Sequence, residues 1–469
     1  MGTFKPYAIF LILIILALAL SFSSQIYGSS VDDWSMFRHD AAQTGFSEGA
    51  SPTASAKLLW NYRVDATATY FPTVPVVTGG FVYVATADQE QALYGVSCFK
   101  SSTGVVVWSF RTEGFAVSTP AVNGDHVYVG SGDPWKPSEG YIYCLDASDG
   151  VEVWNYSVGE PVDSPVNFAE NRVFFESSGG NLYCLDAAEG NKVWNYSTGG
   201  KADGLCPAVA DNYVFVGNHD GNVICLNASN GAAIWNFTAD DSVSSPTVAY
   251  GYVYFGSGDG NAYCVNASSG DKVWNYTTWF NSEGPTNNYH WGNSVGGPAV
   301  AYGYVFVGSS DFDVFCLDAL TGEKVWNVTT SAEVYAAPSV AERCVYVGSY
   351  DGNVYCLNAS SGMENWRYAA GIFSPANAAG SAGSPVIANG EVYVVGNGVL
   401  SVLGLPSSDT AFPLVWVALF VVVLVIVLVV VAYAMSARKR KGADSKLITS
   451  PNKSDNHEMQ ELRAQTLGY

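Results

Sequence analysis

The sequence predicts an all-β fold, an eight-bladed β-propeller of four-stranded blades, followed by one C-terminal transmembrane helix. Two observations support it. A tryptophan recurs eight times at steps of 39 to 52 residues, which is about the length of one blade. Each interval repeats the same order of strands and turns, and a unit of that length must stack on copies of itself to bury its apolar face. The tryptophans are Trp60, Trp108, Trp154, Trp194, Trp235, Trp274, Trp326 and Trp366.

The clearest unit ends at Trp274. Within it, Tyr252–Phe255 and Asn261–Val265 are short β-branched and aromatic runs in which alternate residues face opposite sides, as strands of stacked sheets require. Asp259-Gly260 joins these runs and is typical of a tight hairpin turn in which the glycine has a positive φ angle. A second glycine turns the chain into the strand that ends in tryptophan. It recurs at Gly104, Gly150, Gly190, Gly231, Gly270, Gly322 and Gly362.

The two ends of the repeat indicate how the ring closes. The last unit, Pro385 to Leu405, lacks a tryptophan strand, and the first tryptophan strand, Leu58 to Tyr62, has no unit before it. If the N-terminal strand completes the C-terminal blade, the ring has no open sheet edge between its termini. The alternative is an open solenoid with two incomplete end blades.

The unit Cys-Leu-Asp-Ala-x-x-Gly-x-x-Val-Trp, seen at Cys184–Trp194 and Cys316–Trp326, resembles the tryptophan-docking repeat of the pyrroloquinoline-quinone-like (quinoprotein-type) β-propellers. The opening run Trp34 to Asp40, with Thr44-Gly45 after it, is also similar to the start of that family. The resemblance covers roughly residues 31 to 405. It implies the fold but leaves the function open, because the family includes quinone-dependent alcohol and glucose dehydrogenases and also the non-enzymatic scaffold of the outer-membrane-protein assembly machinery.

The dehydrogenase branch implies features that this chain can be compared with. Alcohol dehydrogenases of that type carry two adjacent cysteines in a disulfide against the quinone, a calcium ion held by Glu, Asn and Asp, and long insertions among the blades. No two cysteines are adjacent here, and most connections are short. Glucose dehydrogenases of the branch also lack the cysteine pair, so an enzyme stays open as the alternative. No catalytic residue carries over, and we expect no cofactor and a closer likeness to the assembly scaffold.

Two apolar segments outside the repeat predict export and membrane anchoring. Residues 8–20 form an apolar run of 13 residues behind Lys5, so we expect residues 1–29 to be a signal peptide, with an uncleaved anchor as the alternative. Residues 412–435 are 24 residues without a charge, long enough to span a bilayer as a helix. Arg438 to Lys441 follow at once. The positive-inside rule therefore puts the tail, 436–469, in the cytoplasm, where we expect it to be disordered, and the propeller, 30–405, outside the cell.

The charge of the predicted external domain excludes one class of partner. Outside the tail and the signal peptide, the chain holds 13 basic and 38 acidic residues, whereas the net charge of the whole chain is −21 at pH 7. Such an acidic surface repels phosphate groups, so we expect no nucleic-acid partner.

Eight Asn-x-Ser/Thr triplets predict N-glycosylation of this external surface. Most of them lie next to a repeat tryptophan or in the turn before it. The alternative is that the repetition copied one triplet that carries no glycan. The asparagines are Asn155, Asn195, Asn227, Asn236, Asn266, Asn275, Asn327 and Asn358.

Seven of the nine cysteines occupy one equivalent position in seven blades, namely Cys98, Cys144, Cys184, Cys225, Cys264, Cys316 and Cys356. Stacked sheets lie about 10 Å apart, whereas a disulfide needs Cα atoms within roughly 7 Å, so we expect buried free thiols. Cys206 and Cys344 lie outside the register, and a pairing that involves one of them stays open. No Cys-x-x-Cys pair or Cys/His cluster predicts a metal site.

The length variation of the repeat predicts the working face. In a four-stranded antiparallel blade, the loop between the second and third strands and the loop to the next blade emerge on one face. Nearly all the variation falls there, at Ala87–Tyr94, Asp133–Gly140, Thr277–Gly297 and Ala369–Gly383. Aromatic residues in these loops are expected to bind a protein partner or, alternatively, a neutral glycan, unless they only pack on one another. They are Trp135, Trp279, Phe280, Tyr289, His290 and Trp291.

Together these patterns predict a single-pass protein of the cell membrane that is not an enzyme. Its external propeller is expected to act as a protein-binding or envelope-assembly scaffold.

Overall fold

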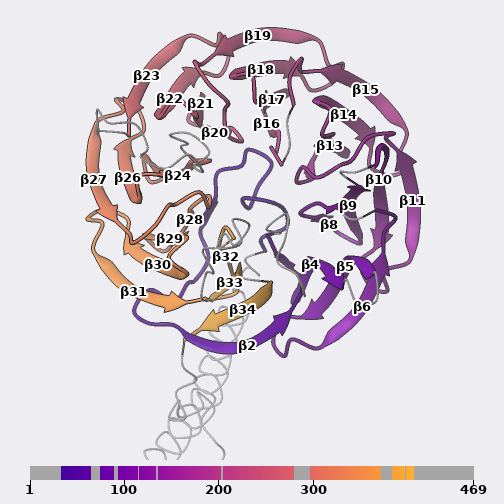
Figure 1. Cartoon of the computed structure of the whole chain (residues 1–469), viewed down its shortest axis with the longest axis horizontal. Helices are drawn as coiled ribbons and strands as arrows, with labels where there is room; N and C mark the ends of the chain where they lie inside the picture. Colours follow the sequence, from indigo (N-terminus) through magenta and orange to yellow (C-terminus); the bar gives the residue numbers. More distant parts are fainter. Residues whose placement is uncertain are drawn as a thin grey trace, which may run out of the picture. The chain divides into compact units, whose positions relative to one another are not determined.

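Eight β-sheets stand around a central axis and form the predicted propeller (Figure 1). The computed structural model describes residues 33–64, 74–88, 93–114, 116–133, 136–201, 204–278, 296–370, 383–396 and 398–405. The predicted signal peptide, transmembrane helix and cytoplasmic tail lie outside these residues. Within the described ranges, no helix has the length and hydropathy needed to cross a membrane.

The blades are antiparallel sheets in which, except for the first two strands of the chain, the strands run in chain order from an inner strand at the axis to an outer strand at the rim. Blade 1 comprises β3 (Val76–Thr78), β4 (Phe81–Asp88), β5 (Leu93–Lys100) and β6 (Val106–Arg111); blade 2 comprises β7 (Ala116–Val117), β8 (Ala121–Asn123), β9 (His126–Asp133), β10 (Lys136–Asp146) and β11 (Glu152–Ser157); blade 3 comprises β12 (Asn167–Ala169), β13 (Arg172–Glu176), β14 (Asn181–Asp186) and β15 (Lys192–Ser197); blade 4 comprises β16 (Ala208–Ala210), β17 (Tyr213–Gly217), β18 (Asn222–Asn227) and β19 (Ala233–Thr238).

The second half of the ring repeats this order. Blade 5 comprises β20 (Thr247–Ala249), β21 (Tyr252–Gly256), β22 (Asn261–Asn266) and β23 (Lys272–Thr277); blade 6 comprises β24 (Ala299–Ala301), β25 (Tyr304–Gly308), β26 (Asp313–Asp318) and β27 (Lys324–Thr329); blade 7 comprises β28 (Ser339–Ala341), β29 (Cys344–Gly348), β30 (Asn353–Asn358) and β31 (Glu364–Ala369), with β1 (Phe46–Ser47) parallel to β28; blade 8 comprises β32 (Val386–Ala388), β33 (Glu391–Gly396), β34 (Val399–Gly404) and β2 (Lys57–Arg63).

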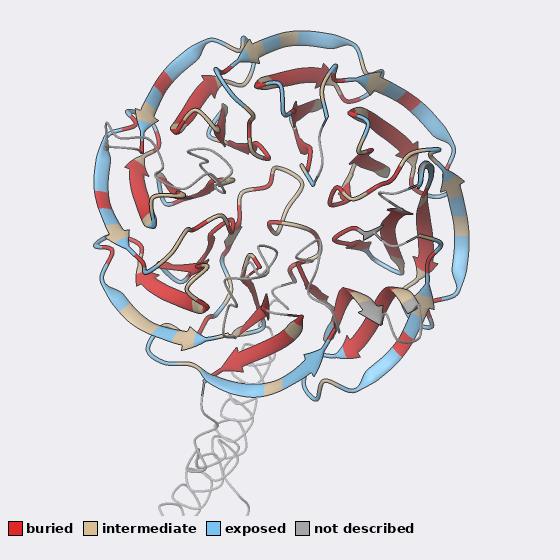
Figure 2. Cartoon of the chain, viewed as in Figure 1, coloured by how far each residue is buried: buried red, intermediate tan, exposed pale blue. Residues whose placement is uncertain are grey.

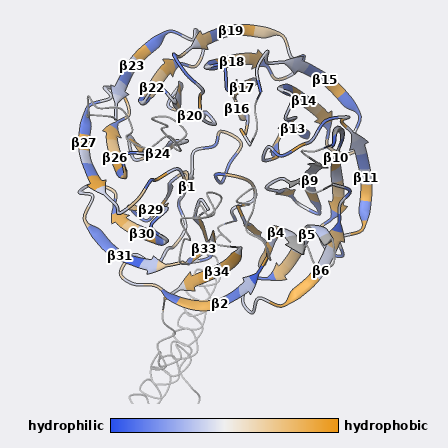
Figure 3. Ribbon diagram, viewed as in Figure 1, coloured by the Kyte–Doolittle hydropathy of each residue, from blue (hydrophilic) through white to orange (hydrophobic). Residues whose placement is uncertain are grey.

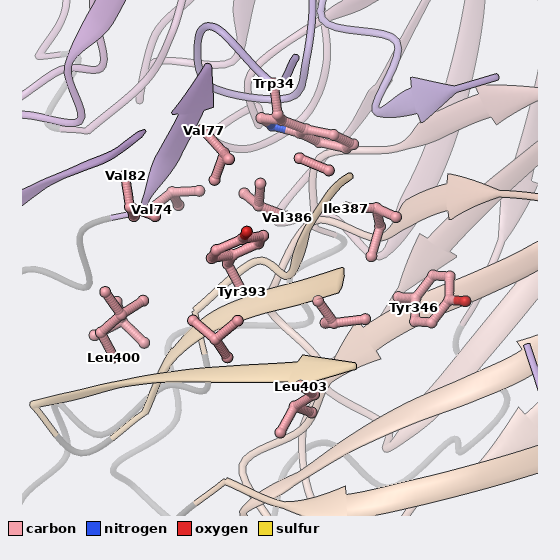
Figure 4. Packing of buried hydrophobic residues seen from close by; sticks show 14 of the residues in the cluster. Trp34, Val74, Val77, Val82, Tyr346, Val386, Ile387, Tyr393, Leu400 and Leu403 are labelled. Carbon is pink, nitrogen blue, oxygen red and sulfur yellow. The ribbon is translucent and has the colours of Figure 1, made fainter. Parts of the chain in front are cut away.

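Blade 8 confirms the predicted closure. β2 pairs antiparallel with β34, with Lys57 opposite Gly404 and Arg63 opposite Val399. The N-terminal strand therefore completes the C-terminal blade, and the open-solenoid alternative is wrong. Beneath this junction, Trp34, Val77 and Tyr393 belong to one buried core that joins blades 7, 8 and 1 (Figure 4).

The hydrophobic core lies between neighbouring blades. The second and third strands of the blades are buried on both faces, whereas the outer strands alternate between exposed and buried residues (Figure 2). In blade 4, for example, Phe215 of β17 packs in one cluster with Val253 and Phe255 of β21 in blade 5. This arrangement explains why the second and third strands are continuous apolar runs while the outer strands carry Asn, Lys and Thr.

Each repeat tryptophan joins its blade to the next one. All eight indole N–H groups donate to a backbone carbonyl at 2.6 to 3.1 Å. In seven cases the carbonyl lies in the turn before the next outer strand, such as Ala267 for Trp235. Trp366 instead donates to Pro52, in the segment that leads into β2. The N-terminal segment thus supplies the missing turn of blade 8 as well as its missing strand.

The glycine that precedes an outer strand, such as Gly270 before β23, is required by this contact. Gly270 has a φ angle of +75°, and a Cβ atom there would lie 2.7 Å from the ring of Trp235. The equivalent glycines are held against the preceding tryptophan in the same way. Glycine is therefore needed both for its left-handed backbone and for the space that a side chain would occupy.

The two faces of the ring differ, and we name them by their connections. The loop face holds the connections between second and third strands and those between blades; the turn face holds the remaining two kinds of turn. On the loop face, the inserts predicted as loops in blades 1 and 2 partly extend hairpins, because β4 continues to Asp88 and β10 begins at Lys136. On the turn face the connections are short and regular. In blade 3, for example, two residues join β12 to β13 and five residues join β14 to β15.

Two glycine variants test the tryptophan contact. Gly270→Ala places a methyl group against Trp235, and we expect it to lower the free energy of unfolding by roughly 2 to 4 kcal/mol, from a left-handed alanine plus overpacking. Gly251→Ala is the matched control, because Gly251 has a φ angle of +79° and nothing within 4 Å of its Cβ position. The control is expected to cost only about 1 to 2 kcal/mol. Equal shifts of the urea midpoint in both variants would contradict the proposed contact.

Candidate functional site

The N-terminal segment Asp33–Ser47, called here the channel segment, crosses the axis of the ring (Figure 1). The middle residue of six inner strands donates its backbone N–H to this segment. The bonds run from Val77 to Trp34, Val122 to Ser35, Val209 to Ala41, Val248 to Ala42, Val300 to Thr44 and Val340 to Gly45, at 2.6 to 2.9 Å. Blade 3 contributes a side chain instead, since Asn167 Nδ2 donates to Ala41 O at 2.9 Å.

Both ends of the channel segment lie at the turn face. The Asp33 carboxylate accepts from Thr78 Oγ1 at 2.7 Å and from the backbone of Gly79, in the first turn of blade 1. Just beyond the other end, Ser51 N donates to Glu342 Oε2 in a turn of blade 7. The segment therefore enters and leaves on the turn face, and its middle reaches into the channel.

The path of the segment depends on unusual backbone angles. Arg38, His39 and Gln43 have φ angles of +55°, +78° and +62°, which side chains other than glycine rarely adopt. Asp40 stabilises the bend, because its carboxylate accepts from the backbone N–H and the hydroxyl of Thr44. Such conformations persist where surrounding contacts hold them, and here the inner strands provide these contacts.

Arg38 points from the segment toward the loop-face side of blade 5. Its Nη1 donates to Ser245 O at 3.3 Å, and its Nη2 donates to the Thr247 hydroxyl. The side chain is buried, and this desolvation lowers the pKa of Arg38 to about 10, although the Cys206 and Asp40 charges act in the opposite direction. The guanidinium remains cationic at neutral pH.

Glu176 is a departure from the repeat. It ends β13, where the other seven blades have Ala85, Gly130, Gly217, Gly256, Gly308, Gly348 or Val395. Glu176 is fully buried, and neither carboxyl oxygen has a hydrogen-bond partner among the described residues. Burial, and secondly the charge of Asp163, raise the pKa of Glu176 well above its ordinary value. The carboxyl group is therefore held toward its neutral form.

Cys206 links these two groups. Phe174, two residues before Glu176 on the same strand, packs against blade 4, so alternation along the strand turns Glu176 toward blade 4 as well. Cys206 lies there, with its N–H on Ser245 Oγ at 2.9 Å and its thiol directed at Pro165 O. Burial raises the pKa of Cys206 well above normal, while Arg38 lowers it and Glu176 raises it. We call Arg38, Glu176 and Cys206 the channel cluster.

The chemistry of the channel cluster favours a structural role in fixing the channel segment over a catalytic one. A thiol reacts as a thiolate, and a raised pKa keeps Cys206 protonated. The channel cluster therefore offers one buried cation beside a neutral acid and a neutral thiol. Among the described residues, no group of three or more His, Cys, Asp or Glu side chains could hold a metal ion.

The quinone and calcium of the dehydrogenases do not fit the described residues. The amide groups at the middle of six inner strands are already bonded to the channel segment, so a planar ring at that depth would have to displace it. The residues there also lack a metal-ligand group. We therefore derive no step through either group.

The aromatic residues predicted for the loop face lie outside the described residues, namely Trp135, Trp279, Phe280, Tyr289, His290 and Trp291. The channel cluster was not predicted from the sequence. One signal was available for it: Glu176 stands where the aligned repeats carry glycine, alanine or valine.

The predicted glycosylation sites fall into two groups. Asn155, Asn195, Asn236, Asn275 and Asn327 are exposed on outer strands, directly after the tryptophan. Asn227, Asn266 and Asn358 are the last residues of β18, β22 and β30, and their side-chain oxygens accept backbone N–H groups of the turns that follow.

The triplets also have a structural role. In blade 4, Asn236 Nδ2 and Thr238 Oγ1 both donate to Asn222 Oδ1 on the neighbouring strand, at 3.1 and 2.9 Å. Cross-strand polar pairs of this kind stabilise a sheet, which gives the repetition of the triplet a physical reason that is independent of glycans.

All nine cysteines are buried free thiols, including the seven in register. Cys344 lies beside Cys356 on the next strand, and Asn365 Nδ2 contacts both sulfurs, at 3.1 and 3.7 Å. The hydrogen bond between the two thiols lowers the pKa of Cys344, and this bond together with burial raises the pKa of Cys356. Because Cys356 is opposite Tyr346, the two cysteines are diagonal neighbours, whose Cα atoms are roughly 7 to 8 Å apart. This separation is too large for a disulfide.

The eight-bladed ring, the tryptophan contacts and the repeat define a propeller of the quinoprotein-like class. The family model described as outer membrane protein assembly factor BamB matches residues 96–206, 198–287 and 281–409. These matches span more than half of the 469 residues, and the chain belongs to this family. No curated protein sequence matches the chain.

Solved structures with the same fold include scaffolds and enzymes. BamB from Moraxella catarrhalis is 20% identical, with a TM-score of 0.57, and the match covers 76% of this chain and 99% of that chain. A europium-containing methanol dehydrogenase is 14% identical, with a TM-score of 0.62 and coverage of 77% and 89%. The quinohemoprotein alcohol dehydrogenase from Comamonas testosteroni is 13% identical, with a TM-score of 0.62 and coverage of 79% and 80%. At these identities the likeness shows the fold alone.

Replacing Glu176 tests its protonation state. Because the folded-state pKa is raised, the stability that Glu176 contributes is present below the ordinary carboxyl pKa and is lost as the pH rises toward the folded value. Glu176→Gln stays neutral at every pH. We expect the variant to be more stable than the parent at pH 8 by about 1 to 3 kcal/mol, and the difference to vanish near pH 4.

Urea midpoints measured across this pH range give the result. Glu189→Gln is the control, since Glu189 is an exposed turn residue whose charged form water solvates. If Glu176→Gln is instead less stable than the parent at pH 8 than at pH 4, the folded protein stabilises the carboxylate anion, and a pH-independent difference would mean that folding does not shift the pKa of Glu176.

Alkylation tests the thiols. In denaturant without reductant, iodoacetamide is expected to modify at least the seven cysteines in register, because blade stacking separates them. Intact mass counts the adducts. A mass corresponding to four disulfides would contradict the free-thiol state.

Proposed function

We propose that the chain is a protein-binding scaffold of the cell envelope, held at the outer side of a membrane by its C-terminal segment. The propeller presents its loop face to a protein partner, and the aromatic residues Trp279 and Trp291 contribute to the contact. A neutral glycan is an alternative ligand for the same aromatic surface. Rigid blades suit this role because they hold loops at a small ordering cost.

The observation that supports a scaffold over an enzyme is the channel segment. Its carbonyl groups accept the inner-strand amides of six blades, so the axis of the ring is occupied by the protein's own backbone. The family match to an assembly factor agrees with this proposal. The dehydrogenases among the structural neighbours favour the alternative, a quinone-dependent alcohol or sugar dehydrogenase.

The path of the last strand is relevant to membrane attachment. β34 begins at the loop face and ends at the turn face, where Gly404 is opposite Lys57. Beyond Leu405, the uncharged run 412–435 follows after a short polar stretch. The proposed anchor therefore continues from the turn face, and the loop face is left for recognition.

Site-specific photocrosslinking in intact host cells tests the loop face. A photoreactive amino acid replaces Trp279 or Trp291 in the full chain, and the control replaces Ser229, an exposed residue of a turn-face turn. We expect discrete protein adducts at the two loop-face positions and none at the control, because the loop face holds the recognition surface.

Two results would overturn this proposal. Adducts that form equally at Ser229 would show that the contact is not specific to the loop face. Stoichiometric binding of pyrroloquinoline quinone with calcium to the purified protein, together with dye-linked oxidation of an alcohol or sugar, would favour the dehydrogenase.

A further inference from the structure

The outer strands of two adjacent blades, β2 of blade 8 and β6 of blade 1, differ from the rest of the rim. Two residues before the tryptophan, these strands have Leu58 and Val106. At the equivalent position, five of the other six blades have a charged residue and one has alanine, namely Glu152, Lys192, Ala233, Lys272, Lys324 and Glu364. Charges on an exposed edge strand prevent unwanted association. At this position β2 and β6 have an apolar residue instead, and their charged residues lie at the ends of the strands.

These two strands also expose apolar side chains. At the position that is charged in most other blades, Leu58 is 41% exposed and Val106 is 39% exposed. Val105, directly before β6, and Val107 are exposed too, as are their apolar equivalents in other blades, such as Val151 and Val153. Colouring by hydropathy shows a hydrophobic stretch in β6 (Figure 3), in agreement with Val106 and Val107 at its start, whereas most other outer strands begin with a charged residue. We call β2 and β6, together with Val105, the bare arc.

The triplet after the tryptophan is absent from the bare arc and from the neighbouring blade 7, where Arg367 follows Trp366. Blades 2 to 6 carry an exposed Asn-x-Ser/Thr asparagine directly after the tryptophan. The bare arc has Asn61 followed by Tyr62-Arg63, which is not a triplet, and Ser109. β2 and β6 therefore lack the triplet that forms a cross-strand polar clamp in blades 4, 5 and 6.

The charge of the bare arc is opposite to that of the protein. Lys57, Arg63 and Arg111 are exposed on β2 and β6, and neither strand contains an acidic residue. The chain as a whole has a net charge of −21. A basic and apolar strip on an acidic protein is complementary to an anionic apolar surface.

The chain leaves the propeller beside this strip. Gly404 is opposite Lys57, and Leu405 is 57% exposed. Six residues, 406–411, separate Leu405 from the uncharged run 412–435. A chain of that length spans at most about 20 Å. If the run lies in a bilayer, blade 8 is held close to the lipid headgroups.

We propose that the bare arc lies against the headgroups of an anionic bilayer, so that the propeller stands on its rim. Leu58, Val105 and Val106 contact the lipid interface, while Lys57 and Arg111 pair with acidic headgroups. A second copy of the chain fits less well, because two identical basic strips repel each other. The role of this contact in the cell rests on the proposed membrane attachment, but the lipid affinity of the arc does not.

Vesicle sedimentation of residues 30–405 tests the proposal. This part contains all eight complete blades, since the ring closes between β2 and β34, so it retains the propeller without the anchor. We expect it to bind vesicles of phosphatidylcholine with phosphatidylserine, not vesicles of phosphatidylcholine alone, and to lose affinity as salt is added. Binding that is independent of phosphatidylserine would overturn the proposal.

Matched variants locate the surface. Lys57→Gln with Arg111→Gln removes two charges from the arc, and we expect a roughly 25-fold loss of affinity, about five-fold for each charge. Lys192→Gln with Lys324→Gln removes the same charge from blades 3 and 6 and is expected to change affinity less than about two-fold. Val106→Glu is expected to abolish binding. Thermal unfolding of each variant verifies the fold.

Two further outcomes would contradict the proposal. Equal losses in the two double variants would mean that the total charge, not the arc, governs binding. If Val106→Glu instead converts a dimer to a monomer in light scattering while vesicle binding persists, the arc is a protein interface. Neither outcome affects the loop-face crosslinks, so failure of this proposal is distinguishable from failure of the scaffold function.

Discussion

The contact between a tryptophan and the glycine turn of the next blade is the interaction on which the ring depends. The indole ring packs against the glycine of the turn, which has no side chain, and the indole N–H donates to a backbone carbonyl of the same turn. Repeated at seven junctions, this contact fixes the distance and the angle between neighbouring blades. The last contact, from Trp366 to Pro52, uses the N-terminal segment, so ring closure and blade docking are one event. Folding therefore requires a contact between residues that are more than 300 positions apart in the chain.

The channel segment adds a second constraint at the axis. It satisfies inner-strand amides that would otherwise face the channel, and unpaired buried amides are costly. Because it runs from blade 1 to blade 7 before it continues to β2, it couples blades that do not touch one another. The channel cluster combines Arg38 of this segment with Glu176 of blade 3 and with Cys206, which precedes blade 4. Its buried charge therefore depends on the same crossing of the ring.

The sequence was sufficient for the repeat, the closing strand and the free thiols in register, because each depends on a residue type that recurs with a fixed period. Features that occur once were harder to predict. Arg38 and Cys206 become neighbours only when the segment crosses the ring, and the Cys344–Cys356 contact depends on a diagonal register. Glu176 could have been found by aligning the blades and asking which position departs from glycine. The loop-face aromatics stay a prediction, since they lie outside the described residues.

The closing strand has a mechanical consequence. A force applied to the chain beyond Leu405 acts along β34, which is hydrogen-bonded to β33 on one edge and to β2 on the other. Both ladders resist in shear and share the force, whereas an outer strand at that place would be peeled away one bond at a time. By covering β34, the N-terminal strand therefore makes the exit point of the chain resistant to pulling, which suits a propeller that is held from one end.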